Sequence, residues 1–353
     1  MWTTLTQKRR RKRSADPDGT AAPHVAEFDG NDQQLAAEID RLTEANRTDA
    51  DGERERELLR LRNLLGVRWL DAADDDAGLA WPDDTALPPP SEGLPELKAA
   101  QLTPGLIRAG ILRDGCVLVR GLVSREQARR FAAQIERSFV ERERHDADRS
   151  FNDRYYIPFE PDPRRGVRLM REWIKEGGGV LAVDSPLLSF EMGELYRAAG
   201  MPELVRGYLG EAPMVTGHKT TLRKAEPQVG GAWHQDGKFM GQVKALNLWL
   251  SLSHCGDDAP GLDLVPRRLD EHVTTETDET MLPNQVSQRI AEEAAGGRGI
   301  LRPIFEPGDA LLFDELFLHK TASDPTMSKP RYAIENWFFG ASAFPGDYVP
   351  LAL

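Results

Sequence analysis

Two runs of apolar residues near the start of the chain are spaced three or four positions apart, as on one face of a helix. The first run is Leu35, Ile39 and Leu42, and the second is Leu58, Leu61, Leu65 and Trp69. The polar stretch 48–52 separates them, so we expect a helical pair. Neither run lasts the three or four heptads of a coiled coil. We interpret the pair as a helical preface packed on, or tethered to, a main domain.

Helix-start signals place the beginning of that domain at residue 103. Thr103 followed by Pro104 is an N-cap with proline at the first helical position. The glycine-bounded apolar run 116–119 predicts a strand. Ser124 with Gln127 forms a capping box that opens another helix.

Beyond a helical stretch at 186–209, interrupted at 200–202, the pattern changes to short strands separated by Gly-, Pro- and Asp-rich turns. The expected strands lie near 216–224, 231–236, 245–252, 262–265, 310–313 and 332–339. Many short strands with such turns favour a sandwich or barrel over a parallel sheet. The long intervals 141–184 and 270–299 are typical of lids or binding loops.

These patterns divide the chain into four parts. Residues 1–34 are expected to be a disordered basic and polar tail, 35–73 the helical preface, 74–102 a linker, and 103–353 the main domain. The tail contains the basic run 8–13, which would suit nucleic acid or a membrane. We favour the simpler interpretation of a solvated tail, because 14–30 is rich in Asp, Gly, Ala and Pro.

Composition narrows the class of protein. The net charge of −12 disfavours nucleic acid as a general partner, because phosphate backbones are bound mainly by clustered Lys and Arg. No apolar run is long enough to span a bilayer, and no apolar core follows the basic stretch as in a secretory signal. Cys116 and Cys255 lie far apart in the sequence, as expected of free thiols in a reducing compartment. We therefore expect a cytoplasmic protein with no membrane partner.

The segment Trp233-His234-Gln235-Asp236-Gly237 carries the candidate chemistry. In an extended strand, residues i and i+2 point to the same face. His234 and Asp236 can therefore converge on one point while Gln235 turns away. A second histidine would complete the two-His-one-carboxylate set of non-haem Fe(II) oxygenases, which leaves coordination positions open.

The chain supplies that histidine far downstream. His319 ends an apolar run that begins with a Pro-Gly-Asp turn at 307–309, and Arg331 opens the next strand-like segment. A hairpin joining the two strands would bring the Arg331 guanidinium into the cavity of His319. These features predict a metal site at His234, Asp236 and His319.

Other candidates are interpreted more simply. His218 is expected to be a satisfied or solvated strand histidine. His254 beside Cys255 lacks further ligands at zinc-like spacing. An arginine cluster in the first long interval could form a lid over an anionic substrate, although a solvated helix face explains it as well. The cluster comprises Arg164, Arg165, Arg168 and Arg171, with Tyr155, Tyr156 and Trp173 nearby.

With these landmarks in order, residues 114–337 resemble the phytanoyl-CoA dioxygenase (PhyH) family of the Fe(II)/2-oxoglutarate-dependent oxygenases. The matching segments are 114–124, 233–237, 247–250, 261–266, and 307–309 leading to His319. About the first hundred residues fall outside the resemblance. It implies a mainly β fold with flanking helices around a double-stranded β-helix core (jelly-roll, cupin-like).

The resemblance also implies a set of ligands. Fe(II) would be held by His234, Asp236 and His319, 2-oxoglutarate would place its far carboxylate on Arg331, and dioxygen would be the third reactant. By position, Asn247 and Thr220 would also line the cosubstrate pocket.

One departure from the family pattern concerns the arginine. Many relatives have Ser or Thr two residues after it, where this chain has Ala333. We expect Arg331 to act alone or with the hydroxyl of Thr220 or Thr221.

The implied activity is hydroxylation of a small organic molecule, with release of succinate and CO2. A natural-product intermediate, an amino-acid-like molecule or an acyl substrate would each suit the family. Family members that halogenate have a small residue in place of the carboxylate, so Asp236 favours hydroxylation. Desaturation or epimerisation at the same iron site stays open, as does a non-catalytic jelly-roll binding or regulatory protein. The N-terminal helices are a candidate interaction element, and the sequence indicates no oligomeric state.

Overall fold

A large mixed β-sheet forms the frame of the protein. The computed structural model describes residues 27–73, 81–83, 93–162, 165, 167–240, 243–274 and 285–353. Among them, nine strands form one sheet with the order β1-β2-β8-β6-β10-β4-β11, in which β5 pairs with β10 and β3 with β5. β7 and β9 form a second, two-stranded sheet. The strands are β1 (Glu96–Lys98), β2 (Cys116–Arg120), β3 (Gly179–Leu181), β4 (Met214–Thr216), β5 (Thr221–Ala225), β6 (Ala245–Ser251), β7 (Leu262–Leu264), β8 (Ala310–Phe313), β9 (His319–Thr321), β10 (Arg331–Phe339) and β11 (Pro350–Ala352).

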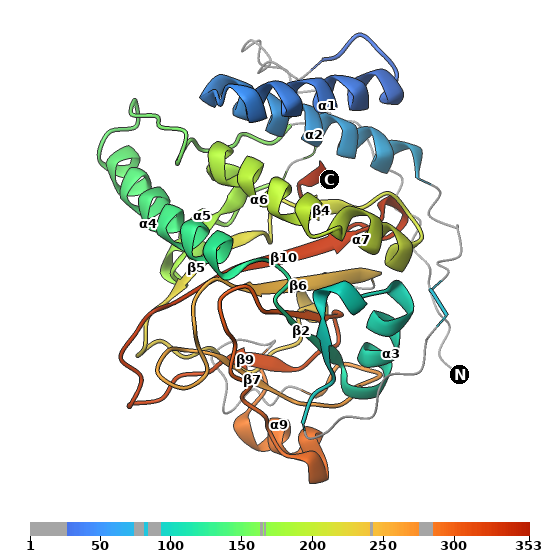
Figure 1. Ribbon diagram of the computed structural model, residues 1–353, viewed down its shortest axis with the longest axis vertical. Coiled ribbons are helices and arrows are strands. Elements are labelled where there is room, and N and C mark those ends of the chain that lie inside the picture. Colours follow the sequence, from blue (N-terminus) through green and yellow to red (C-terminus); the bar gives the residue numbers. More distant parts are fainter. Residues whose placement is uncertain are drawn as a thin grey trace, which may run out of the picture.

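Helices cover one face of the large sheet, and β7 and β9 lie on its other side (Figure 1). Thr103 caps α3 by accepting from the Leu106 amide at 3.2 Å, and Ser124 and Gln127 form the expected capping box on α4. The predicted stretch 186–209 is two helices, broken at Gly200 as expected. The helices are α1 (Asp32–Thr48), α2 (Gly52–Ala72), α3 (Pro104–Asp114), α4 (Arg125–Ala147), α5 (Arg171–Glu176), α6 (Pro186–Ala198), α7 (Met201–Leu209), α8 (Gly237–Met240) and α9 (Gln288–Ala295).

Strict alternation along the central strands separates the two faces of the sheet. In β6, Leu248 and Leu250 join a buried cluster with α3, α4, α6 and α7, whereas Trp249 faces the second sheet. In β10, Phe338 packs on the helices and Trp337 on the opposite side. Side chains of a strand alternate between faces, so the odd-numbered positions of both strands point toward β7 and β9.

The second sheet is short but is extended by single bridges. Isolated pairings join His234 to His319, Trp233 to Val286, and Leu264 to Leu301. A layer of aromatic and aliphatic side chains fills the space between it and the large sheet, including Trp249, Phe305 and Phe313. On this side of the large sheet, the core therefore lies between the large sheet and the second sheet.

The helical preface is packed onto the main domain. Leu35 and Ile39 of α1 meet Leu58, Leu61 and Leu65 of α2 in one buried cluster that also includes Ala352 of β11. Asn63 of α2 donates to the Pro350 carbonyl oxygen at 2.8 Å, and Arg62 donates to the Ala352 carbonyl oxygen at 2.9 Å.

A buried ion pair adds a second attachment. Glu55 of α2 is fully buried and accepts from Arg154 of the main domain, with Nε–Oε2 at 3.1 Å. Asn46 of α1 also donates to this carboxylate, at 3.3 Å. The pair therefore ties both preface helices to the segment after α4.

Several predicted boundaries differ from the structure. Helical residues outnumber strand residues among the described part of the chain, so "mainly β" is not confirmed. The predicted strand 216–224 is divided into β4 and β5 by a turn in which the Thr220 amide donates to the Thr216 carbonyl oxygen. Segment 231–236 forms only single bridges. β1, within the predicted linker, pairs in parallel with β2. Residues 1–26 of the predicted tail, and residues 74–80 and 84–92 of the predicted linker, lie outside the described residues.

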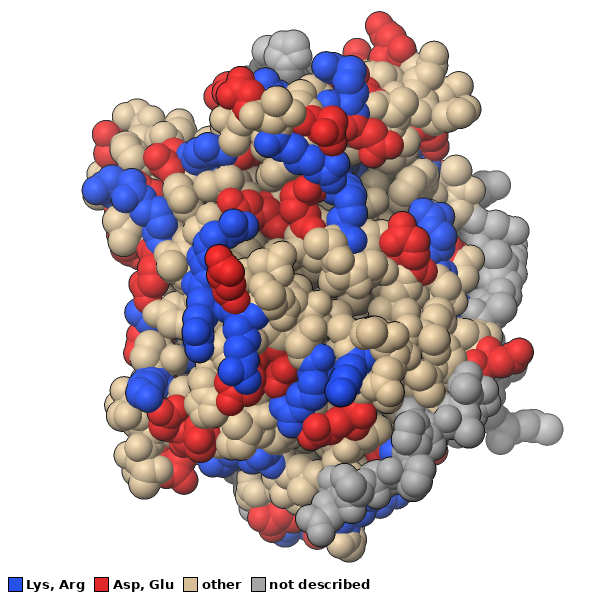
Figure 2. All heavy atoms as spheres, viewed as in Figure 1, with Lys and Arg blue, Asp and Glu red and all other residues tan. Residues whose placement is uncertain are grey.

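Charged side chains of both signs are interspersed over the face in Figure 2. Ion pairs are common among the described residues, such as Arg47 with Glu194 at 2.6 Å and Lys175 with Asp146 at 2.6 Å. In the part of the chain that the structure describes, no helix combines the length and apolar character required to cross a bilayer.

Candidate metal and cosubstrate site

His234, Asp236 and His319 converge at one point between the two sheets. The His234 amide donates to the His319 carbonyl oxygen at 3.0 Å, and the His319 amide donates back at 3.2 Å. This antiparallel bridge sets the two imidazole rings 4.5 Å apart, centroid to centroid. Asp236 Oδ2 lies 4.0 Å from His319 Nε2, and one ligand atom from each residue lies within 4.8 Å of the others.

Backbone contacts fix which imidazole nitrogen faces the cluster. Nδ1 of His234 lies 2.8 Å from the Ala232 carbonyl oxygen, and Nδ1 of His319 lies 3.1 Å from that of Phe317. A Nδ1–H donating to a carbonyl leaves Nε2 as the lone-pair nitrogen, the usual arrangement of metal-binding histidines. Gln235 turns away as expected, donating to the Leu316 carbonyl oxygen at 2.7 Å.

The protonation states also suit a divalent cation. Burial, and after it the neighbouring His234, lower the pKa of His319 to about 4. Burial alone would raise the pKa of Asp236, but Lys219 and the two histidines lower it below its usual value. A neutral imidazole beside an ionised carboxylate at neutral pH is the form in which such ligands bind metal.

Arg331 lies in the same cavity with no hydrogen-bond partner. Its side chain is fully buried, and Nε and both terminal nitrogens lack acceptors in the structure. The guanidinium carbon sits 5.2 Å from the centroid of the Trp249 ring, and Glu335 Oε1 is 4.0 Å from the nearer terminal nitrogen. A buried guanidinium without hydrogen-bond acceptors is costly, and its planar fork of donors matches a carboxylate.

The cavity that joins these groups has a volume of about 670 Å³. The three metal-ligand candidates, Arg331 and Asn247 all line it. The Asn247 Oδ1 is buried without a partner, which leaves it available to a ligand.

The structure does not place Thr220 on the cavity wall. Its hydroxyl donates to the Thr216 carbonyl oxygen at 2.6 Å and lies 2.8 Å from Asn336 Oδ1. The next residue, Thr221, lines the cavity instead. The sequence analysis offered Thr220 or Thr221 in place of the hydroxyl that is missing at Ala333, and only Thr221 lines the cavity.

The wall also includes residues that were not predicted from the sequence, among them Lys219, Arg223, Trp249 and Glu335. Alternation along β10 could have identified Glu335, because positions 331 and 335 share a face of the strand. Lys219 Nζ lies 3.5 Å from Asp236 Oδ1, a contact between distant segments that no local pattern indicates.

The remaining histidine candidates lie elsewhere. His218 stacks on Tyr348 with ring centroids 4.6 Å apart. His254 contacts Glu306 Oε1 at 3.1 Å and Asp257 Oδ1 at 2.8 Å, so both ring nitrogens have partners.

The arginine cluster is divided. Arg171 makes an ion pair with Asp184 at 2.8 Å, and Arg168 is exposed. Arg164 lies outside the described residues. Trp173, about half exposed, lines the mouth of the cavity.

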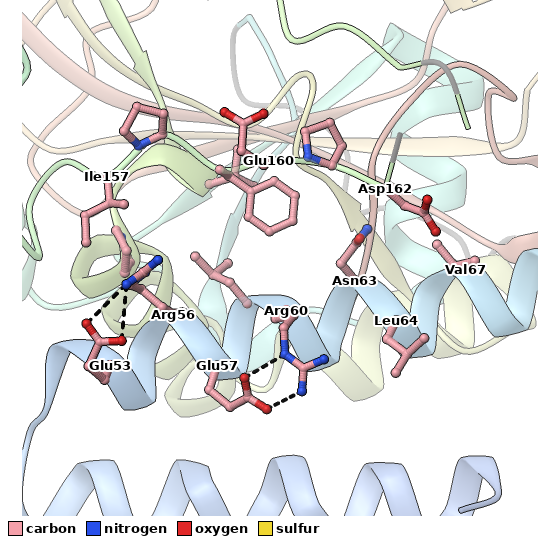
Figure 3. Close-up of a pocket in the computed structure, with 16 residues that line it drawn as sticks. Glu53, Arg56, Glu57, Arg60, Asn63, Leu64, Val67, Ile157, Glu160 and Asp162 are labelled. Carbon is pink, nitrogen blue, oxygen red and sulfur yellow. Dashed lines mark hydrogen bonds and ion pairs between the residues drawn. The ribbon is translucent and has the colours of Figure 1, made fainter. Parts of the chain in front are cut away.

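A second cavity of about 560 Å³ lies between α2 and the segment 157–162. Figure 3 shows its α2 wall, where Arg56 pairs with Glu53 and Arg60 with Glu57. Neither metal-ligand candidates nor Arg331 line it.

Comparison with known proteins agrees with this geometry. The model of the family described as phytanoyl-CoA dioxygenase (PhyH) matches residues 111–331, more than half of the chain. The chain belongs to the phytanoyl-CoA dioxygenase family. This PhyH-family protein is therefore an Fe(II)- and 2-oxoglutarate-dependent oxygenase, with dioxygen as the oxidant.

The chain is also similar to solved structures. One is EctD from S. alaskensis with 2-oxoglutarate and 5-hydroxyectoine, at 18% identity and a TM-score of 0.46, covering 76% of this chain and 85% of that one. Another is the epimerase SnoN in complex with Fe3+, alpha ketoglutarate and nogalamycin RO, at 17% identity and a TM-score of 0.41, covering 66% and 82%. No protein with a curated description matches the chain.

Proposed function

We propose that this PhyH-family protein hydroxylates a small organic molecule, with Fe(II) held by His234, Asp236 and His319. The observation that carries the proposal is the shared cavity, in which these three residues lie with a buried arginine that has no hydrogen-bond partner. Two neutral imidazoles and one carboxylate leave coordination positions open for other reactants. When bound, Fe(II) with 2-oxoglutarate and dioxygen supplies the oxidising chemistry, and succinate and CO2 are released.

The protein's own groups bind and orient the reactants. Arg331 offers parallel N–H donors to the distal carboxylate of the cosubstrate, and burial against Trp249 excludes water from that contact. Asn247 and Thr221 add polar groups on the wall. The carbonyl contacts of both Nδ1 atoms keep the imidazoles oriented toward the metal position.

The carboxylate of Asp236 supports hydroxylation over halogenation. It lies at the position where a halogenating relative has a small residue, so no room is left there for a halide. Desaturation and epimerisation use the same ligand set, and product mass distinguishes them from hydroxylation. A binding protein that had lost turnover would be expected to lack a ligand or the arginine, whereas this chain retains all four.

The test is anaerobic addition of Fe(II) and 2-oxoglutarate to the purified protein, followed by visible spectroscopy. A weak charge-transfer band from the bidentate complex is expected, and its absence in the wild type would exclude the assignment of the cosubstrate. His319→Ala and Asp236→Ala should abolish both the band and substrate-independent succinate formation. His254→Ala, which removes a histidine outside the cavity, is the matched control and should retain both.

Substrate identity requires a metabolite screen with the iron-loaded protein. A product heavier by one oxygen atom supports hydroxylation. A loss of two hydrogens, or a change of stereochemistry at unchanged mass, would instead show desaturation or epimerisation.

A further inference from the structure

A carboxylate lies close to Arg331 without forming a hydrogen bond to it. Glu335 and Arg331 share one face of β10, and the nearer pair of atoms, Arg331 Nη2 and Glu335 Oε1, are 4.0 Å apart. Both side chains line the cavity. Since a small rotation of Glu335 would bring it onto the guanidinium, something in the structure must hold the carboxylate back.

Arg223 is the group that holds it. Arg223 Nε donates to Glu335 Oε1 at 3.1 Å, and Arg223 Nη2 donates to Glu335 Oε2 at 2.7 Å. Both carboxylate oxygens are therefore engaged in a bidentate contact, the strongest geometry for this pair. The contact crosses two neighbouring strands, because β5 and β10 pair with Ala333 opposite Arg223.

The Arg223 side chain is itself fixed from the other side. Its Nη1 donates to the Gly177 carbonyl oxygen at 2.6 Å, in the turn that follows α5. Each of the three nitrogens of this guanidinium therefore donates a hydrogen bond within the protein, and two of them hold the Glu335 carboxylate.

We propose that Arg223 is a positioning residue that keeps Glu335 off Arg331 and thereby leaves the Arg331 guanidinium available to the cosubstrate carboxylate. The two arginines and one glutamate together carry one net positive charge, which a single carboxylate neutralises. Without Arg223, Glu335 turns to Arg331 and forms a neutral pair. The incoming carboxylate must then displace an internal competitor of the same charge.

The inference rests on the proposed binding of 2-oxoglutarate at Arg331, and direct binding measurements test it. The dissociation constant for 2-oxoglutarate is measured anaerobically by calorimetry on the Mn(II)-loaded protein, using Arg223→Gln, Glu335→Gln and the double variant. Arg223→Gln should weaken binding by about tenfold or more, equivalent to about 1.4 kcal/mol. The double variant should return to within about threefold of wild type, because the competitor is gone.

Several outcomes separate the possibilities. A double variant as weak as Arg223→Gln would overturn the proposal, since it would show a loss of structure and not competition by Glu335. Glu335→Gln alone should bind 2-oxoglutarate at least as tightly as wild type, and weaker binding would also overturn it. In steady-state assays, KM for 2-oxoglutarate should rise more than kcat falls in Arg223→Gln.

Controls keep this inference distinct from the proposed function. Arg130→Gln removes an exposed arginine 4.0 Å from Glu191 and should bind like wild type. If wild type fails to bind 2-oxoglutarate, the proposed function fails. If wild type binds and Arg223→Gln binds equally well, only the role of Arg223 fails.

Discussion

Replacing Arg331 with methionine should stabilise the ligand-free protein while strongly weakening its binding of the cosubstrate. Methionine retains an apolar stem of similar length beside Trp249 but removes the buried charge. Most substitutions at a fully buried position destabilise a protein. The opposite sign is expected here, because the guanidinium lacks any hydrogen-bond partner.

The structure allows a rough estimate of the size. A buried ion without a direct partner costs several kcal/mol. Attraction to Glu335, 4.0 Å away, offsets part of this burial penalty, by up to about 4 kcal/mol at an effective dielectric constant near 20. A net penalty of about 1–2 kcal/mol is left for methionine to remove. Loss of one partner from a buried charged contact costs about 2–5 kcal/mol in binding, so the dissociation constant should rise roughly 30- to 4,000-fold.

Urea unfolding with and without 2-oxoglutarate measures both effects. Without ligand and with Mn(II) present, the variant should show the higher unfolding free energy. At a concentration of 2-oxoglutarate about 100 times the wild-type dissociation constant, wild type should gain about 2.7 kcal/mol, whereas the variant should gain less than about 0.9 kcal/mol. A variant that is less stable without ligand yet equally stabilised by 2-oxoglutarate would refute the assignment of Arg331.

Three other predictions follow from buried polar groups. His319→Ala should weaken Co(II) binding by about 100-fold or more, because a ligand itself is lost, whereas removal of a group that only hydrogen-bonds to a ligand costs about 10–100-fold; unchanged affinity by calorimetry would exclude His319 as a ligand. Burial, followed by the adjacent Asp314 carboxylate, raises the pKa of Glu315 to about 7. The folded protein therefore favours the protonated carboxyl group, and this stabilisation is fully present below pH ~4.5 and is lost as the pH rises through 7. Glu315→Gln should therefore gain on the order of 2 kcal/mol over wild type between pH 5 and 8.5 in urea unfolding, and parallel pH profiles would contradict this. Arg154→Ala should lower the free energy of unfolding by about 3–5 kcal/mol, because it leaves the buried Glu55 carboxylate without its charged partner. Arg41→Ala, which removes an exposed ion pair within a helix, should lower it by less than about 0.5 kcal/mol. Equal losses in urea unfolding would show that burial of the pair is irrelevant.

Local patterns predicted those parts of the fold that local physics determines. The caps at Thr103 and Ser124 are set by hydrogen bonds within one turn, and the break near Gly200 by backbone preference. Strand β8 was predicted with its observed ends, because its apolar run lies between clear turn signals. The convergence of His234 and His319 was expected from their strands, and an antiparallel bridge joins them.

Features that depend on distant contacts were not predicted. Thr220 was expected on the cavity and Thr221 was the better choice, because the turn before β5 sets which face each residue takes. A shift of one residue moves a strand side chain to the other face. β1 and β11 are short strands whose pairing partners lie elsewhere in the chain. The Arg223–Glu335 pair likewise depends on the register between β5 and β10, which composition and periodicity do not specify.

The packing of α2 on β11 has a consequence for biosynthesis. Asn63 and its partner Pro350 are separated by 287 residues of sequence. At a synthesis rate of about 5–20 residues per second, α2 leaves the ribosome roughly 15–60 s before the strand it covers. During that interval α1 is its available apolar partner nearby in sequence, so the two helices can shield one another as a hairpin. The large sheet, which includes β10 with Arg331, can be completed by β11 only after the intervening residues have been synthesised, so this sheet forms later than the helical pair.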